Sequence, residues 1–174
     1  MKNNILQIYH YILSLFWGED LIQQSFRGAL GKSNNVLIIV PIDLAAAVEL
    51  IPCIKSLADA GKRITILIYH DIRYKFPNDH RLKYEEYFKS DLILERYPKF
   101  SFLQRLRKLR FDLVVDLDLD GNNFTSLCIL AVHSPYKAGI SRKYFERAYN
   151  IRFQKKEDQK LTIAQNYVDL LNGL

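Results

Sequence analysis

The sequence predicts an α/β fold, a three-layer, Rossmann-like domain around a mostly parallel sheet of five or six strands, with a helix added at the N-terminus. Two observations predict it. Apolar runs of strand length alternate along the chain with segments of helical periodicity. The apolar runs are also continuous, which is typical of strands that helices cover on both faces. In such a sheet we expect right-handed crossovers and ligands outside the carboxyl ends of the strands.

The first expected unit is a strand, a short turn and a helix. Val36–Val40 is a continuous apolar run, and Leu44–Ala60 has the periodicity of a helix. Asp43 is placed to cap that helix, because its carboxylate can accept a backbone N–H of the first turn. Pro52 should bend the helix, and Gly61 should end it.

The remaining elements follow from the same patterns. The predicted further strands are Ile64–Tyr69, Leu92–Leu94, Phe111–Leu117 and Tyr136–Ile140. The predicted further helices are Arg81–Phe88, Ser101–Arg110, Phe124–Val132 and Leu161–Leu171, with a polar loop over 71–81. We therefore expect residues 34–174 to form the Rossmann-like domain and residues 1–33 to form a helical extension.

Composition restricts the class of partner. The chain has 174 residues, of which 49% are hydrophobic and 25% charged, and its net charge is +6. A moderate positive charge favours anionic partners without choosing among them. Because no nucleic-acid-binding motif is present, nucleic acid is an unlikely partner. The two isolated cysteines, Cys53 and Cys128, are expected to be reduced and buried, as is usual in the cytoplasm.

The N-terminal segment Ile5–Trp17 is rich in large apolar residues at helical spacing. One interpretation is a helix packed on the domain. Another is a membrane-surface helix with Trp17 at the interface, which would make the chain peripheral at the inner membrane. A cleaved signal peptide is the third, although no small-residue cleavage site follows the segment.

Several segments resemble glycosyltransferase family 9, the heptosyltransferases of lipopolysaccharide core assembly. Asn35–Pro52 is similar to the family's first strand-turn-helix unit, and Phe111–Leu117 (FDLVVDL) to a later strand. Ala138–Ile140, Arg147–Asn150 and Val168–Leu171 resemble the segments that lead to the end of the family's first domain. The resemblance implies one half of a GT-B fold. It also implies that a separate donor-domain chain supplies the nucleotide sugar, because the family binds the donor mainly on a second domain.

The turn after the first strand departs from the family pattern. The resemblance implies a glycine and a catalytic aspartate there, the aspartate acting as general base on the acceptor hydroxyl. Counting back from Pro52 places that base at Ala46, and Ala45 precedes it. Alanine cannot accept a proton, so Asp43 is the remaining catalytic candidate. We expect a heptosyltransferase-like acceptor-side domain that is inactive alone, or alternatively a non-catalytic binding or scaffold protein.

The predicted substrate-binding residues lie in three loops at the carboxyl ends of the strands. They are Asp43, Leu44, Ala45, Ala46, His70, Asp71, Asp118 and Asn122. An anionic glycolipid or a membrane surface is the expected ligand or partner, and His70 beside Asp71 either transfers a proton, binds phosphate or has no role. The basic residues of Ser101–Arg110 either face solvent or contact acidic lipid.

The run Asp116-Leu117-Asp118-Leu119-Asp120-Gly121 resembles the start of a calcium-binding EF-hand loop. Leu127 occupies the position of that loop's bidentate glutamate, and this excludes an EF-hand calcium site here. A metal-holding Asp-x-Asp motif is a second interpretation. The third has Asp118 and Asp120 solvated and Asp116 hydrogen-bonded at the strand end. We expect no metal and no cofactor, since phosphate-binding glycine loops and histidine ligand spacings are missing from the sequence.

Overall fold

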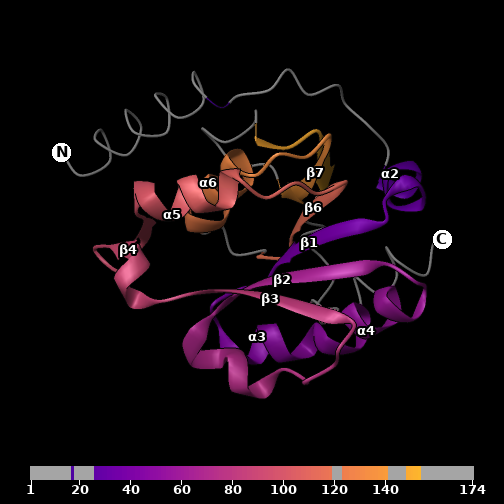
Figure 1. The fold of residues 1–174 in the computed structure, drawn as a ribbon, viewed down its shortest axis with the longest axis horizontal. Coiled ribbons are helices and arrows are strands. Elements are labelled where there is room, and N and C mark those ends of the chain that lie inside the picture. Colours follow the sequence, from indigo (N-terminus) through magenta and orange to yellow (C-terminus); the bar gives the residue numbers. More distant parts are fainter. Residues whose placement is uncertain (1–16, 18–25, 119–122, 141–147, 154–174) are drawn as a thin grey trace, which may run out of the picture.

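The computed structural model describes residues 17, 26–118, 123–140 and 148–153. A six-stranded sheet in the order β3-β2-β1-β6-β7-β8 runs through the molecule, and every neighbouring pair is parallel (Figure 1). The strands are β1 (Asn35–Ile39), β2 (Arg63–Tyr69), β3 (Leu82–Tyr87), β6 (Leu113–Asp116), β7 (Tyr136–Ile140) and β8 (Ile151–Phe153). The predicted α/β class and parallel sheet are confirmed.

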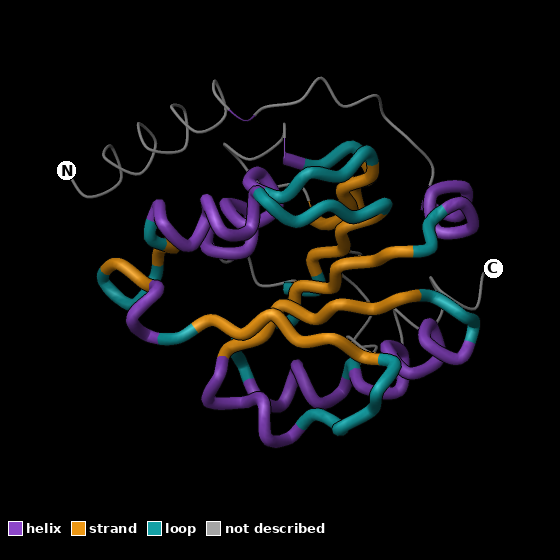
Figure 2. Tube along the Cα trace, viewed as in Figure 1, coloured by secondary structure: helices purple, strands orange, loops and turns teal. Residues whose placement is uncertain are grey.

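Helices cover both faces of the sheet (Figures 1 and 2). One face carries α3 (Leu44–Glu49) and α4 (Ile51–Asp59), and the other carries α5 (Phe100–Arg107) and α6 (Asn123–Ala131). The short helix α2 (Phe26–Lys32) packs Ala29 and Leu30 into the core on the α4 side. The result is the three-layer arrangement that continuous apolar strands require.

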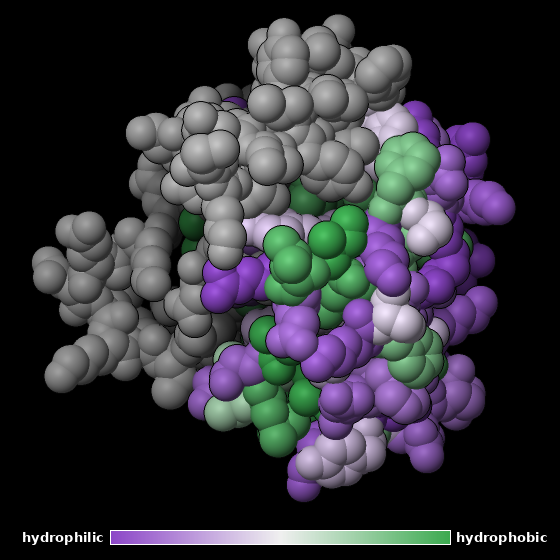
Figure 3. Space-filling model, turned by 90° about the vertical axis from the view of Figure 1, so that its left-hand side faces the viewer, coloured by the Kyte–Doolittle hydropathy of each residue, from purple (hydrophilic) through white to green (hydrophobic). Residues whose placement is uncertain are grey.

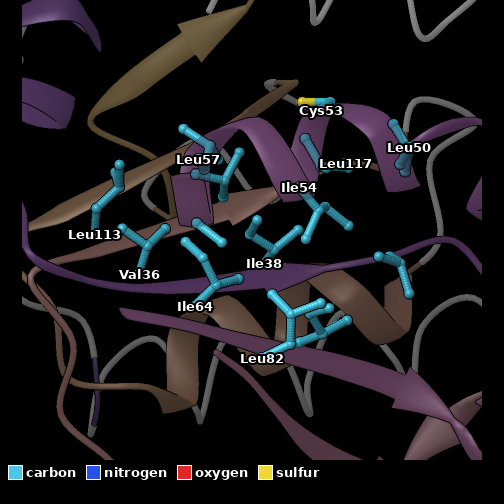
Figure 4. Close-up of a cluster of buried hydrophobic side chains, with 14 of the residues drawn as sticks. Val36, Ile38, Leu50, Cys53, Ile54, Leu57, Ile64, Leu82, Leu113 and Leu117 are labelled. Atoms are coloured by element: carbon cyan, nitrogen blue, oxygen red, sulfur yellow. The ribbon is translucent and has the colours of Figure 1, made fainter. Parts of the chain in front are cut away.

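Alternation along β1 explains why its apolar run is continuous. Val36 and Ile38 belong to the core under α4, which Figure 4 shows with Ile54 and Leu57. Leu37 and Ile39 point to the opposite core, against α5 and α6. All four side chains are at most 1% exposed. Successive residues of a strand face opposite sides, so a central strand in this fold needs apolar residues at every position.

The predicted single helix over Leu44–Ala60 is wrong, because α3 and α4 are separate helices joined at Leu50. Pro52 is the second residue of α4, where its missing N–H has no helical acceptor to lose. Pro52 therefore starts a new helix instead of bending an existing one. Gly61, with φ at +80°, follows the end of α4 as predicted.

The predicted helix Arg81–Phe88 is also wrong. Leu82–Tyr87 forms β3, which pairs in parallel with all but the first residue of β2. Its sequence Leu-Lys-Tyr-Glu-Glu-Tyr carries residues that favour helices, but an edge strand commonly carries charges of this kind. Tertiary pairing with β2 overrides the local preference.

The predicted strand Leu92–Leu94 is present only as the two-residue β4 (Leu92–Ile93), outside the main sheet. It pairs antiparallel with β5 (Tyr97–Pro98) in a short hairpin. Between β2 and β5 the chain also forms two 3-10 helices, η1 (His70–Lys75) and η2 (Lys89–Asp91). The strand β8 was not predicted, and the predicted helix Leu161–Leu171 lies outside the described residues.

Candidate functional site at the carboxyl ends of the strands

Since the main sheet is parallel, the carboxyl ends of its strands share one edge. The segments that leave this edge are the turn Val40–Asp43 after β1, the 3-10 helix η1 after β2, and the residues that follow β6. The sequence prediction placed its substrate-binding residues in these three segments. The structure brings all three to this edge, because β1 pairs in parallel with both β2 and β6. The first two also lie on the same side of the sheet, since Leu44 and Ile72 pack against the same core.

The turn after β1 presents small side chains and one capped carboxylate. Asp43 is extended (φ −65°, ψ 122°), and its Oδ1 accepts the backbone N–H of Ala46 at 2.9 Å. This is the N-cap that the sequence predicted. Ala45 is exposed, Ala46 is half-buried and Ala47 is fully buried. The Asp43 carboxylate is thus oriented toward the start of α3.

An open cavity of about 570 Å³ lies beside η1. His70, Asp71, Arg73, Tyr74, Asn78 and Glu86 line it. His70 Nδ1 is 2.6 Å from Glu86 Oε2, and the imidazole ring lies 4.5 Å from the ring of Phe88. A carboxylate on Nδ1 fixes the orientation of the ring and directs Nε2 away from that contact.

Arg73 holds the wall of this cavity in place. Its guanidinium donates to the Phe76 carbonyl at 3.2 Å and to Asn78 Oδ1 at 3.0 Å, and lies 3.5 Å from the centre of the Tyr84 ring.

Burial, followed by a hydrogen bond with Asp71, raises the pKa of the Tyr69 hydroxyl. The cavity therefore offers carboxylates, an amide, an imidazole and the exposed ring of Tyr74. These groups can hydrogen-bond and stack against a polyhydroxylated ligand.

Asp116, at the end of β6, is buried in a hydrogen-bond network. Its carboxylate accepts from Thr125 Oγ1 at 3.0 Å, from Tyr149 Oη at 2.7 Å and from the backbone N–H of Asp118 at 3.0 Å. Only 1% of the Asp116 surface is exposed. The third interpretation of the acidic run is thus confirmed for Asp116. These bonds tie β6 to α6 and to Tyr149, two residues before β8.

Asp118 differs from its prediction. It is 6% exposed, so the expectation of a solvated side chain is wrong. The backbone turn over Asp116–Asp118 brings it inward, because the Asp118 N–H bonds back to the Asp116 carboxylate. Asn122 and Asp120 lie outside the described residues.

Sequence reasoning missed four of the six residues that line the η1 cavity, which are Arg73, Tyr74, Asn78 and Glu86. Glu86 pairs in register with Ile68 of β2, so its position depends on a strand that was predicted as a helix. In a Rossmann-like sheet the third strand in sequence pairs with the outer edge of the second. This topology rule could have indicated a strand after the segment that follows β2.

Within the described residues, no group of three or more His, Cys, Asp or Glu side chains is arranged to hold a metal ion. In the same part of the chain, no helix has the length and apolar character needed to cross a bilayer. Cys53 and Cys128 are free thiols and buried, as predicted.

Comparison with known proteins found no match among protein-family models or curated proteins. Among solved structures, the chain is similar to a glycosyl transferase of family 9 from Veillonella parvula DSM 2008. The TM-score is 0.60 at 15% identity, covering 89% of this chain and 42% of that one.

The chain is also similar to E. coli heptosyltransferase WaaC in two complexes. With ADP, the TM-score is 0.55 at 14% identity, covering 77% of this chain and 46% of that one. With ADP-2-deoxy-2-fluoro heptose, the TM-score is 0.59 at 14% identity, covering 79% of this chain and 47% of that one. The predicted resemblance to family 9 is confirmed at the level of fold. This chain spans less than half the length of these glycosyltransferases.

Proposed function

We propose that this chain is a heptosyltransferase-like, acceptor-side domain that serves lipopolysaccharide or other surface-glycan assembly and does not transfer sugar by itself. The likeness in fold to a family 9 glycosyltransferase and to a heptosyltransferase supports the class of ligand. In this proposal the chain acts in the cytoplasm, at the surface of the inner membrane.

One observation carries the proposed inactivity. The only carboxylate of the β1–α3 turn, on Asp43, accepts the Ala46 N–H at 2.9 Å. Ala45 and Ala46 contribute only methyl groups next to it. A general base must reach the hydroxyl whose proton it removes, and a carboxylate that caps a helix is oriented elsewhere. In this proposal the turn is an acceptor-side loop that lacks the group needed to activate the acceptor.

The η1 cavity supports binding of a glycan. Its His70, Asp71, Asn78 and Glu86 side chains present donors and acceptors on the same edge of the sheet as the turn, and Tyr74 adds an exposed ring. The net charge of +6 favours an anionic, phosphorylated acceptor. The donor nucleotide sugar would then be bound by a separate polypeptide.

An NMR titration of the full chain tests this proposal. The probes are mannose 6-phosphate, as a phosphorylated sugar, and ADP, as the donor's nucleotide. We expect mannose 6-phosphate to shift the backbone amides of 43–47 and 70–73, and ADP to leave them in place. Shifts at these amides with ADP, or none there with the sugar phosphate, would count against an acceptor-side role.

A scaffold without ligand chemistry is the second candidate, favoured by the exposed apolar side chains Ile93 and Leu94. The double variant Ala45→Gly/Ala46→Asp separates the two. With a donor-binding half supplied as a separate polypeptide, an acceptor-side domain is expected to gain transfer of heptose from ADP-heptose. A scaffold gains none. Thermal unfolding of the variant shows whether it remains folded in either case.

A further inference from the structure

Exposed large apolar side chains concentrate in one segment of the chain, around the β4–β5 hairpin, at Phe88, Ile93, Leu94 and Phe100; they are called here the hairpin surface. Their exposed fractions are 43%, 46%, 76% and 49%. They are four of the seven exposed large hydrophobic residues of the described chain, and they lie within 13 residues of sequence. Figure 3, which faces this side of the molecule, shows several apolar residues close together, with hydrophilic residues to their right. Clustered apolar exposure of this kind marks an interaction site.

The backbone at the tip of the hairpin is strained. Leu94 has φ at 51° and Glu95 has φ at 57°, and the Arg96 N–H closes the turn on the Ile93 carbonyl at 3.2 Å. Two successive left-handed residues are typical of a tight hairpin turn that favours Asn-Gly. A leucine here is unfavourable both for the backbone and for hydration. The strained turn carries Leu94, the most exposed large apolar side chain of the described residues.

Cationic residues accompany the hairpin surface. Arg96 and Lys99 are exposed, and their side chains form no ion pair in the part of the chain that the structure describes. Nearby acidic groups are already paired, Glu95 with Lys89 at 2.5 Å and Glu85 with Arg105 at 3.0 Å. Apolar side chains beside unpaired cations match the two contributions that hold a peripheral protein on an anionic bilayer.

The shape of the hairpin favours a lipid surface over a protein partner. The hairpin projects at one end of the molecule, beyond α5 (Figure 1). A projecting tip buries little area against another globular protein, whereas a stable protein interface needs roughly 1,000 Å² or more. Lipid can surround a projecting tip on all sides. Trp17, whose ring centre lies 5.6 Å from that of Phe100 in a stacked arrangement, adds a residue type that is enriched at membrane interfaces.

We propose that the tip of the β4–β5 hairpin inserts into the surface of an anionic phospholipid bilayer. Ile93 and Leu94 enter the boundary between headgroups and acyl chains, and Arg96 and Lys99 contact the phosphates. This inference is independent of the proposed sugar binding, because it uses none of the residues of the η1 cavity or of the β1–α3 turn.

Vesicle binding by the full chain tests the insertion. The vesicles are phosphatidylcholine alone, or phosphatidylcholine with about a quarter of anionic phosphatidylglycerol. Binding is followed by co-sedimentation and by the fluorescence of Trp17, the chain's single tryptophan, which lies beside the hairpin surface. We expect binding to the anionic vesicles, a blue shift of the emission, and weak or no binding to phosphatidylcholine alone.

The variant Leu94→Asn separates binding from folding. Asparagine tolerates the left-handed backbone better than leucine, so the thermal midpoint should stay unchanged or rise. Vesicle affinity should fall by roughly tenfold, because one exposed leucine no longer enters the bilayer. The matched control is Val48→Asn, which removes another exposed apolar side chain, on α3, and should leave vesicle binding unchanged.

The double variant Arg96→Glu/Lys99→Glu should weaken binding to the anionic vesicles by at least about fivefold for each reversed charge. The inference is overturned if the wild-type chain does not bind anionic vesicles. It is also overturned if Leu94→Asn binds as tightly as wild type, or if Val48→Asn loses as much affinity as Leu94→Asn.

Discussion

Replacing Asp43 by alanine tests whether its carboxylate acts as a helix cap. The side chain takes part in a single described hydrogen bond, in which the Ala46 N–H donates to Oδ1 at 2.9 Å. Alanine leaves that N–H without its acceptor, while the backbone bond from the Ala47 N–H to the Asp43 carbonyl at 2.9 Å remains. Loss of such a cap costs about 1 kcal/mol. In a chain of 174 residues this corresponds to a fall of roughly 2–4 °C in Tm.

Asparagine at the same position is the matched control. Its side-chain oxygen caps a helix about as well as a carboxylate, but it cannot act as a general base near neutral pH. We therefore expect Asp43→Asn to keep wild-type stability in urea unfolding, with Asp43→Ala less stable by about 1 kcal/mol. Equal stability of the alanine variant and the wild type would refute the capping role. The carboxylate would then be available for another function.

Three further outcomes follow from the packing and the titrating groups. Gly139→Ala should lower the free energy of unfolding in urea by about 2 kcal/mol. The added Cβ would lie 3.0 Å from the Asp116 Cβ and closer still to the buried ring of Tyr149. An unchanged midpoint would be evidence against this packing. Backbone N–H groups at the start of β1 lower the pKa of the Asp112 carboxyl in the folded chain. The stability that Asp112 contributes is therefore complete above about pH 4 and is lost as the pH falls through the pKa of the folded state. The stability of Asp112→Asn should differ from that of wild type at pH 6, and the two should converge toward pH 2. Burial raises the pKa of Cys53 to about 11 and that of Cys128 well above its usual range. Neither thiol should therefore react with a disulfide reagent at pH 8 until urea unfolds the chain. Rapid reaction of the native protein would contradict their burial.

The central strands could be predicted because continuous runs of apolar residues identify strands that are buried on both faces. β1 and β2 are apolar on both faces, and the predicted ranges nearly match the observed ones. The Asp43 cap was also predictable, because capping depends on residues within one helical turn. Both features follow from neighbours in sequence.

The remaining features depend on pairing between distant segments. β3 is an edge strand with half-exposed Tyr84, Glu85 and Glu86, so it lacks the buried run that identified the other strands. Once β3 was predicted as a helix, the contact between His70 and Glu86 could not be predicted. The bond from Tyr149 to Asp116 joins residues 33 apart, and no local pattern encodes it.

The β4–β5 hairpin could not be predicted from the sequence for a different reason. The turn at Leu94 contains no glycine or asparagine, so the rules for tight turns did not indicate a hairpin. A sequence that departs from its local preference in this way often does so for a functional reason. This conflict could be recognised only after the backbone angles were known.

The most direct test of the central proposal is a sugar-transfer measurement with the full chain and a matched variant. The chain is incubated with ADP-heptose and a phosphorylated acceptor glycan, and a donor-binding half is supplied as a separate polypeptide. We predict no transfer by wild type and measurable transfer after Ala45→Gly/Ala46→Asp, because only the variant has a carboxylate free to accept the proton. Transfer by the unaltered chain that disappears in Asp43→Asn would contradict the account.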